Sequence, residues 1–346
     1  MNDISEDKKQ GAILGHAIGD ALGAPVEFYP YAQYSGILNT PITRYTRAYG
    51  KQVSSIGQIT DDTEMALVLL KTIESDTGYT KDKAIVNYMI WANNNFEGCK
   101  GKTPFMGKNT RNLLVAPKPT VKLYTNRFRK YYPDETTKEN SQSNGALMRS
   151  YPLAFVEDNE IIKHDTEITN PSKLTYNAVY VYVSAIKMAL NGKTKKNIKR
   201  KIMSLIEFDE LKIAYEQACN NQFRDVTKNR GHVVHGFYCA FWGLFQFDNY
   251  KSAIDAIICL TSEVNIKPKF VEPGKYKKKD IVVGDTDTNA AIAGALMGAY
   301  YGIEKLHEDE ITRGNIDVLL SCDTSNGDIV RPKEYEIRQY FIDNFK

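Results

Sequence analysis

The chain has 346 residues, of which 42% are hydrophobic and 25% charged, and its 45 basic and 42 acidic residues give a formal net charge of +3. This near balance argues against nucleic acid as the main partner, because nucleic-acid-binding domains carry a marked excess of positive charge. No run of about 18 apolar residues occurs, so we expect no membrane span. Length and composition suit a single domain over residues 1–346 that buries a large core.

The five cysteines are scattered along the chain and form no CxxC pair; they are Cys99, Cys219, Cys239, Cys259 and Cys322. An odd number of cysteines, several of them in apolar stretches, indicates reduced thiols and an intracellular, cytoplasmic protein. The first ten residues, MNDISEDKKQ, are polar and do not have the apolar centre of a signal peptide.

The first predicted helix, Gly11–Gly23 (GAILGHAIGDALG), has a glycine at every fourth position, which places the glycines in one stripe on its surface. The segment Ala290–Gly302 (AAIAGALMGAYYG) repeats this spacing near the other end of the chain. A glycine inside a helix costs about 1 kcal/mol relative to alanine, so two such stripes indicate close contact with another backbone. We therefore predict that these two helices pack against each other in the centre of the molecule.

Five further segments have the apolar period of helices: Thr63–Ile73, Lys81–Trp91, Tyr176–Leu190, Val234–Phe247 and Ser252–Thr261. The alternation typical of strands is scarce, which predicts an all-α domain. Residues Pro117–Ser143 are polar and contain three prolines, and we predict a long loop there.

Two basic runs, Lys193–Lys201 and Lys275–Lys279, interrupt this pattern. We interpret them as solvated helix ends and loops. The alternative is a positive field that steers a polyanionic substrate towards the protein.

Two short acidic clusters, Gly57–Glu64 (GQITDDTE) and Gly284–Asn289 (GDTDTN), each precede a helical pattern directly. One such cluster alone is most simply a helix N-cap, for which Asp and Thr are well suited. Each cluster, however, supplies at least two carboxylates and at least one hydroxyl, which is more than a cap needs. The adjacent Asp61 and Asp62 repel each other unless a proton or a cation lies between them. If the clusters meet in the interior, divalent cations would offset the cost of burying their charges.

Oxygen ligands of this kind favour Mg²⁺ or Mn²⁺, whereas zinc would require Cys or His at ligand spacing. Two such cations act as Lewis acids and as a source of activated water, and a spare carboxylate can serve as general base. The clusters thus predict a hydrolase for an oxygen-rich substrate.

Four blocks resemble, in order, those of the ADP-ribosylglycohydrolase family, which includes the dinitrogenase reductase-activating glycohydrolase: GAILGHAIGDALGAPVEF, GQITDDTEMALVLL, SNGALMRSYPLAF and GDTDTNAAIAGALMGAYYG. They run from about residue 11 to residue 302. The resemblance implies a single compact, orthogonal multi-helix domain with two Mg²⁺ or Mn²⁺ ions. It also implies cleavage of the bond between ribose C1″ of ADP-ribose and a modified side chain, with an ADP-ribosylated protein or small molecule as partner. We expect a monomer.

The resemblance also implies site residues. The metal ligands would be Thr60, Asp61, Asp62, Asp285, Asp287 and Thr288. Catalytic roles, including that of general base, would fall among Glu27, Asp61, Asp62 and Asp287, without a choice between them. The substrate would contact a loop with Ser141, Gln142, Asn144 and Gly145, and a second turn at Gly107.

The chain departs from the family pattern at two positions that would contact the substrate. Asn170 stands where many relatives have a histidine that helps to bind the distal part of the ligand, and an asparagine cannot carry charge. His232 stands where many relatives have a tyrosine near the adenine. These departures bear on ligand affinity and acceptor preference more than on the metal site.

Other interpretations compete with this one. The segment Gly98–Thr103 (GCKGKT) has two residues between its glycines where a phosphate-binding loop needs four, so we set nucleotide triphosphate binding aside. His232 and His235 lie three apart with no evident third ligand, which favours core or substrate-lining histidines over a metal pair. A non-enzymatic ADP-ribose-binding or structural member of the fold, or a hydrolase of another ADP-ribosylated small molecule, stays open.

Overall fold

The computed structural model of the chain describes residues 5–27, 42, 54–98, 106–260 and 283–345. Within these ranges the secondary structure is helical apart from isolated β-bridge positions, two of which pair Ser143 with His232. The prediction of an all-α fold is confirmed. None of the helices in these ranges is long and apolar enough to cross a lipid bilayer.

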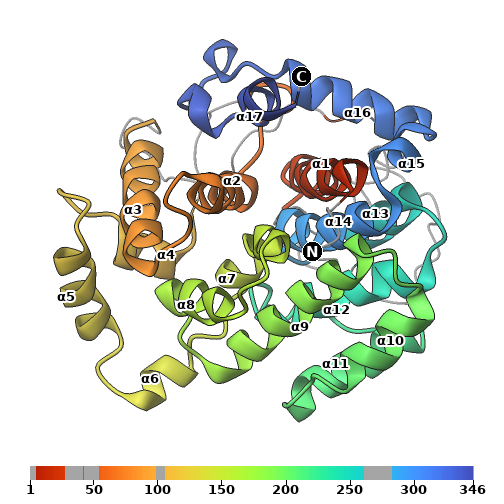
Figure 1. Cartoon of the computed structure of the whole chain (residues 1–346), viewed down its shortest axis with the longest axis horizontal. Coiled ribbons are helices and arrows are strands. Elements are labelled where there is room, and N and C mark those ends of the chain that lie inside the picture. Colours follow the sequence, from red (N-terminus) through yellow and green to blue (C-terminus); the bar gives the residue numbers. More distant parts are fainter. Residues whose placement is uncertain (1–4, 28–41, 43–53, 99–105, 261–282, 346) are drawn as a thin grey trace, which may run out of the picture.

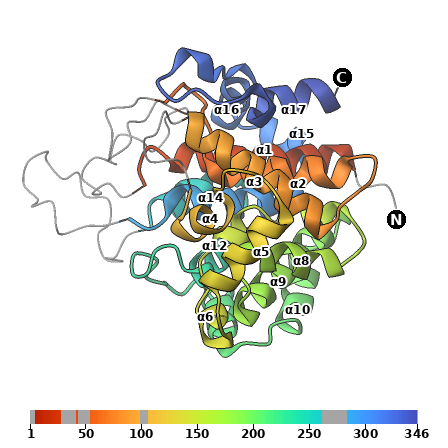
Figure 2. The same cartoon turned by 90° about the vertical axis from the view of Figure 1, so that its left-hand side faces the viewer.

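In chain order the α-helices are α1 (Glu6–Gly23), α2 (Asp61–Glu74), α3 (Lys81–Gly98), α4 (Lys108–Leu114), α5 (Val121–Tyr131), α6 (Glu135–Glu139), α7 (Gly145–Met148), α8 (Glu160–Thr169), α9 (Lys173–Leu190), α10 (Lys195–Met203), α11 (Asp209–Cys219), α12 (Val233–Gln246), α13 (Tyr250–Ile258), α14 (Thr286–Tyr301), α15 (Ile303–His307), α16 (Glu310–Ser321) and α17 (Ile337–Asn344). Short 3₁₀ helices are η2 (Tyr151–Phe155), η3 (Thr324–Asn326) and η4 (Lys333–Tyr335). Figures 1 and 2 show α1 and α14 side by side in the centre, with the other helices around them.

The two glycine stripes face each other, as the sequence predicted. A Cβ atom placed on Gly11 would lie 2.5 Å from the carbonyl oxygen of Gly298, and one placed on Gly15 would overlap the carbonyl oxygen of Gly294. A Cβ atom placed on Gly19 would likewise overlap the carbonyl group of Ala290. The two helices thus run antiparallel with their backbones in direct contact, which only residues without side chains allow at these positions.

This antiparallel contact brings the C-terminal end of α1 to the N-terminal end of α14. The hydroxyl of Thr286 donates a 2.9 Å hydrogen bond to the carbonyl oxygen of Gly23 in the buried interior. A Cβ at Gly23 would lie 2.5 Å from the carbonyl carbon of Thr286. The second acidic cluster is therefore held against the end of α1 by direct contact between the two backbones and by this hydrogen bond.

The other predicted helices are confirmed with shifted ends. α2 begins two residues before the predicted start because Thr60 is its N-cap. α3 continues from Trp91 to Gly98, and α9 begins at Lys173 because the hydroxyl of Ser172 caps it. α12 begins and ends one residue before the predicted bounds, and α13 covers Tyr250–Ile258. The predicted end at Thr261 lies outside the described residues, as do Cys99 and the basic run Lys275–Lys279.

The prediction of one long loop over Pro117–Ser143 is wrong, because α5 and α6 lie within it. Thr120 caps α5 by accepting a hydrogen bond from the backbone of Leu123, and Asp134 forms a capping box with Thr137 at the start of α6. The prolines precede the caps and do not interrupt either helix. α5 has an apolar face, because Tyr124 is buried and Val121, Leu123, Phe128 and Tyr131 pack partly buried against the core.

The four described cysteines all have free thiols, as predicted. Cys239 and Cys322 are buried, and Cys219 and Cys259 are half-buried. Burial raises the pKa of Cys259 to about 12, so this thiol stays protonated near neutral pH.

The close helix contact can be tested with two alanine substitutions. Gly294→Ala places a methyl group against the backbone of Gly15, and we expect it to destabilise the protein by about 1–3 kcal/mol or more. Gly314→Ala, in the middle of α16, has nothing within 4 Å of the added carbon, and we expect it to stabilise the protein by about 0.5–1 kcal/mol. Urea unfolding of both variants measures the difference. Shifts of the unfolding midpoint in the same direction would contradict the direct backbone contact.

Candidate metal centre

Three helix ends meet at one place in the interior. The C-terminal end of α1 lies there, followed by Glu27, together with the first turns of α2 and α14. The carboxylate of Asp62 is repelled by those of Asp61 and Asp285. The carboxylate of Asp287 is repelled by those of Glu27 and Asp62. The two acidic clusters, which lie more than 200 positions apart in the sequence, therefore form one group of carboxylates.

Asp20, which the sequence analysis did not select, joins α1 to α2. Its carboxylate accepts hydrogen bonds from the backbone N–H groups of Thr60 and Thr63, at 3.0 and 3.1 Å, and from their hydroxyls at 2.8 and 2.6 Å. It therefore caps the first turn of α2 from a neighbouring helix. Asp20 is the only carboxylate in the segment Gly11–Gly23, but this local feature does not indicate which helix it caps.

The carboxylates form two overlapping groups. In the first, one oxygen each from Asp20, Asp62 and Asp287 lies within 4.8 Å of the others, and all three residues are buried. In the second, Glu27, Asp285 and Asp287 satisfy the same distance, with Glu27 and Asp285 half-buried. Asp287 belongs to both groups, so two neighbouring positions share one carboxylate.

The charges in this centre are unfavourable without a cation. Burial, followed by repulsion from Asp20, Asp61 and Asp285, raises the pKa of Asp62 well above its ordinary value. Burial, followed by repulsion from Glu27 and Asp285, does the same to the pKa of Asp287. Burial also raises the pKa of Asp20, although its four hydrogen bonds oppose this shift. Each carboxylate would gain stability from a nearby positive charge.

The donor set fits hard divalent cations. The Oδ1 atom of Asp62 is buried and has no hydrogen-bond partner among the described residues, which is costly unless it coordinates an ion. Both groups consist of carboxylates, the hydroxyl of Thr60 lies 3.1 Å from Asp62, and no histidine or cysteine belongs to either group among the described residues. Such oxygens suit Mg²⁺ or Mn²⁺ rather than zinc.

The two threonines predicted as ligands lie beside these carboxylates. The Thr60 hydroxyl is 2.8 Å from Asp20 and 3.1 Å from Asp62. The Thr288 hydroxyl bonds Asp62 and lowers its pKa, against the larger effect of burial, while the Thr288 backbone N–H donates to Asp287 at 2.9 Å. Both hydroxyls are buried within reach of the same group of oxygens.

The predicted substrate loop joins the carboxylate group through Asn144. Its amide donates a 2.8 Å hydrogen bond to Asp285, and its backbone N–H donates to the carbonyl oxygen of Gly231 at 2.8 Å. The carbonyl oxygen of Gln142 accepts from the backbone of Val233. The loop is therefore fixed between the first turn of α14 and the start of α12.

Two residues that we predicted to contact the substrate instead stabilise this loop. They are Asn170, which lies outside the loop, and Ser141, which belongs to it. The amide of Asn170 donates to the hydroxyl of Ser143 at 2.8 Å and to the backbone of Ser141 at 3.3 Å, and only 1% of the residue is exposed. The Ser141 hydroxyl is 2.8 Å from that of Tyr132. The polar groups of Asn170 and Ser141 are thus used within the protein.

Gly107 lies at the N-terminus of α4, where it is exposed and a Cβ would meet nothing within 4 Å. Thr110 of the same helix approaches the position where a Cβ of Gly145 would lie, at 3.9 Å. The second predicted substrate turn is thus adjacent to the first.

The two histidines have separate partners. His232 is the N-cap of α12, with its Nε2 atom 3.1 Å from the side-chain oxygen of Gln142. His235 is 2.8 Å from the carbonyl oxygen of Lys228 through Nε2, and its Nδ1 accepts from Arg224. Burial lowers the pKa of both rings, that of His235 to about 4, so both are neutral at physiological pH. Neither belongs to a group of potential metal ligands among the described residues.

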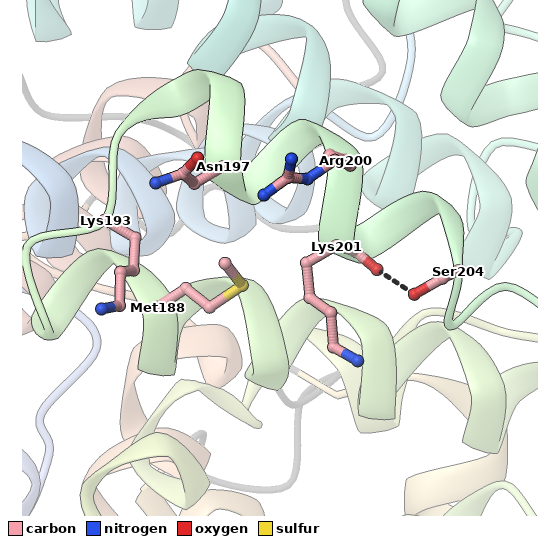
Figure 3. A pocket seen from close by; sticks show the side chains of 6 residues that line it. All are labelled: Met188, Lys193, Asn197, Arg200, Lys201 and Ser204. Atoms are coloured by element: carbon pink, nitrogen blue, oxygen red, sulfur yellow. Dashed lines mark hydrogen bonds between the residues drawn. The ribbon is translucent and has the colours of Figure 1, made fainter.

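The basic run Lys193–Lys201 forms α10 and its N-terminal approach. Figure 3 shows a groove between α9 and α10 lined by Met188, Lys193, Asn197, Arg200, Lys201 and Ser204. The predicted substrate loop contacts α9 at Thr175, whose hydroxyl donates to the Ser141 carbonyl oxygen, whereas Met188 lies about 20 Å further along at 1.5 Å per residue. The groove therefore does not adjoin the carboxylate group.

Comparisons with known proteins bear on the family and the fold of the chain. The sequence profile of a family described as ADP-ribosylglycohydrolase matches residues 1–266 and 280–319. ADP-ribosylarginine hydrolase Tri1 from Pseudomonas putida GB-1 is 26% identical over 86% of this chain and 71% of that protein. The glycohydrolase of ADP-ribosyl-(dinitrogen reductase) from Rhodospirillum rubrum is 26% identical over 87% of each chain. A solved structure, of an ADP-ribosylglycohydrolase-related protein complex, matches with a TM-score of 0.58 at 20% identity over 90% of this chain and 96% of that one, which shows the fold.

Cation binding should be visible in thermal stability. We expect Mg²⁺ or Mn²⁺ at 100 times its dissociation constant to stabilise the folded protein by about 2.7 kcal/mol, because the ions bind only where the carboxylates are assembled. Asp287→Asn removes the shared carboxylate, so it should abolish this response and make the protein more stable in EDTA than the wild type. Differential scanning calorimetry with and without EDTA measures both effects. Asp317→Asn, on the exposed face of α16, is the control and should keep the full response. A cation response retained by Asp287→Asn would contradict the assignment.

Proposed function

The chain belongs to the ADP-ribosylglycohydrolase family, and on that basis we propose that it is a metal-dependent hydrolase that removes ADP-ribose from a modified protein side chain. The observation that carries this proposal is the pair of carboxylate groups that share Asp287 at the meeting point of α1, α2 and α14. An enzyme of this family needs a site for the ribose beside such a centre, and the loop Ser141–Gly145 adjoins it through the bond from Asn144 to Asp285.

Two Mg²⁺ or Mn²⁺ ions would be held by the predicted ligands Thr60, Asp61, Asp62, Asp285, Asp287 and Thr288, with Asp20 fixing the first turn of α2. When bound, such ions polarise substrate oxygens and lower the pKa of a coordinated water. The protein's own contribution is to hold these carboxylates at the first turns of α2 and α14, so that little reorganisation is needed when the substrate enters.

Among the four candidate bases, Glu27 is the one that we propose as proton acceptor. Asp62 and Asp287 are buried and would be used by the cations, whereas Glu27 is half-buried and belongs to the group with Asp285 and Asp287. A general base must both reach the reacting water and pass its proton to solvent, which a half-buried carboxylate can do. Asp61, also half-buried, is the alternative.

The substrate would lie between the carboxylates and the two loops. We propose that Gln142, Asn144, Gly145 and Gly107 line the ADP-ribose, with Ser141 and Asn170 keeping the first loop in shape. The Nε2 atom of His232 lies within hydrogen-bond distance of Gln142, and we propose that His232 contacts the ligand next to Gln142. Because His232 is neutral, it would recognise a ligand by hydrogen bonding or stacking rather than by charge.

The names of two relatives indicate the acceptor class. One is called an ADP-ribosylarginine hydrolase, and the other acts on ADP-ribosylated dinitrogen reductase. We therefore propose an ADP-ribosylated protein, modified on arginine, as the substrate, and a monomeric enzyme. The bond that breaks would join the arginine guanidinium to ribose C1″.

The experiment is a comparison of ADP-ribose release from peptides modified on arginine or serine, with Mg²⁺, Mn²⁺ or EDTA. We expect release from the arginine-linked peptide that EDTA abolishes. Glu27→Gln should lower kcat by roughly 10²–10⁴-fold and still bind the cations, because it removes the base and not the centre. Asp287→Asn should lose both cation binding and turnover.

Other outcomes would change the proposal in different ways. Tight ADP-ribose binding without turnover by the wild-type chain would favour a non-enzymatic binding protein. Release that EDTA does not affect would remove the cations from the reaction. Release from the serine-linked peptide alone would overturn the proposed acceptor and leave the hydrolase.

A further inference from the structure

The part of the chain that follows the family match is tied to the metal centre. The family profile ends at residue 319, yet the chain continues through η3, η4 and α17. Figure 1 shows α17 packed beside α2, at the top of the molecule. This C-terminal segment, residues 322–345, contacts Glu64 at the start of α2.

Glu64 lies in the first turn of α2, two residues after Asp62, with only 1% of its surface exposed. Arg331 of the C-terminal segment donates two hydrogen bonds to its carboxylate, through Nε at 2.7 Å and Nη2 at 2.8 Å. The indole N–H of Trp91 donates a third at 2.8 Å. The remaining guanidinium nitrogen of Arg331 donates to the carbonyl oxygen of Asn94 at 3.1 Å. This two-pronged, buried pair fixes both the position and the orientation of the Glu64 side chain.

The same segment also holds the residues before α2. The amide of Gln58 donates to the carbonyl oxygen of Ile329 at 2.9 Å. Gly327 packs directly on the backbone of Ser55, since a Cβ there would lie 2.8 Å from the Ser55 nitrogen. Thr60 and Asp62 are therefore fixed from both directions, by Gln58 on one side and Glu64 on the other.

We propose that Arg331 is a positioning residue of the metal centre, which acts through Glu64 to set the place of Asp62. Because Arg331 donates two hydrogen bonds to Glu64, its effect on Asp62 would pass through the first turn of α2. This inference rests on the proposed function only in taking Asp62 as a cation ligand.

Arg331 would be needed because the acidic side chains in the first turn of α2 repel one another. Asp61, Asp62 and Glu64 are three acids in one helical turn, and Asp62 is repelled further by Asp20 and Asp285. Without Arg331, Glu64 would be a buried and unpaired charge, and the turn could relieve it only by moving or unwinding. A shift of the turn would separate Asp62 from Asp287, and the affinity for the cation would fall.

A second buried arginine offers a matched comparison. Arg149 pairs with Asp165 at 3.1 Å, and neither side chain is more than 1% exposed. It donates to the carbonyl oxygen of Gly145 at 2.7 Å and to the hydroxyl of Thr169 at 2.8 Å. Arg149 therefore supports the predicted substrate loop, where Arg331 supports the metal helix.

The test measures two affinities in the same full-length variants by calorimetry: that for Mn²⁺ alone, and that for ADP-ribose at saturating Mn²⁺. We expect Arg331→Met to weaken Mn²⁺ binding about 10- to 100-fold, as losses of supporting contacts at metal sites do, with little change in ADP-ribose affinity. Arg149→Met should do the reverse. Arg331→Lys keeps the charge without the two-pronged geometry and should recover part of the Mn²⁺ affinity. Urea unfolding of each variant reports its stability separately.

A general loss of structure would give a different result. Arg331→Met and Arg149→Met would then weaken both ligands to the same extent, and that outcome would overturn the positioning role, as would unchanged Mn²⁺ affinity in Arg331→Met. If Arg331→Met does not fold, Glu64→Gln and Arg331→Lys decide instead, and wild-type Mn²⁺ affinity in both would overturn it. A wild-type chain that binds Mn²⁺ with this dependence but releases no ADP-ribose would overturn the proposed function and leave the role of Arg331 standing. A wild-type chain that binds no Mn²⁺ would overturn both.

Discussion

Close backbone packing between α1 and α14 is the constraint on which the other features of this molecule depend. Gly15 and Gly294 allow the two helices to approach until the carbonyl oxygen of each residue lies where the other would carry a Cβ atom. Because the helices are antiparallel, this contact fixes the ends of α1 and α14 relative to each other. If side chains lay between the two helices, the position of Asp287 relative to Asp20 would depend on the rotamers of those side chains.

The second constraint is electrostatic and opposes the first. Folding gathers Asp20, Asp62 and Asp287 in a buried space where their charges repel, so the assembled centre costs free energy in the absence of a cation. Part of this cost is offset locally, since Asp20 accepts four hydrogen bonds from the first turn of α2 and helix N-termini favour negative charge. The remainder would favour the proposed binding of divalent ions, because a cation would relieve the repulsion between these carboxylates.

The sequence predicted much of this arrangement because its signals were local. Glycines at every fourth position can be read directly, and their explanation requires only a partner backbone, which Ala290–Gly302 supplied. Carboxylates ahead of a helical pattern are similarly visible. Asp20 was missed because its role is to cap α2, a helix 40 positions away, and no local pattern marks such a cap. Arg331 was missed for the same reason, since its partner Glu64 is 267 positions away. The helix α5 was missed because its short apolar face, with Val121, Tyr124 and Phe128, lies in a polar segment that also contains three prolines.

The pairing of distant segments has a consequence for biosynthesis. Asp287 and Thr288 are translated more than 220 residues after Asp20 and Thr60. During that interval α1 has no α14 to pack against its glycine stripe, and the acids of α2 lack their neighbours from α14. The proposed cation site therefore cannot assemble before α14 has left the ribosome, and contacts between such distant parts of a sequence form slowly.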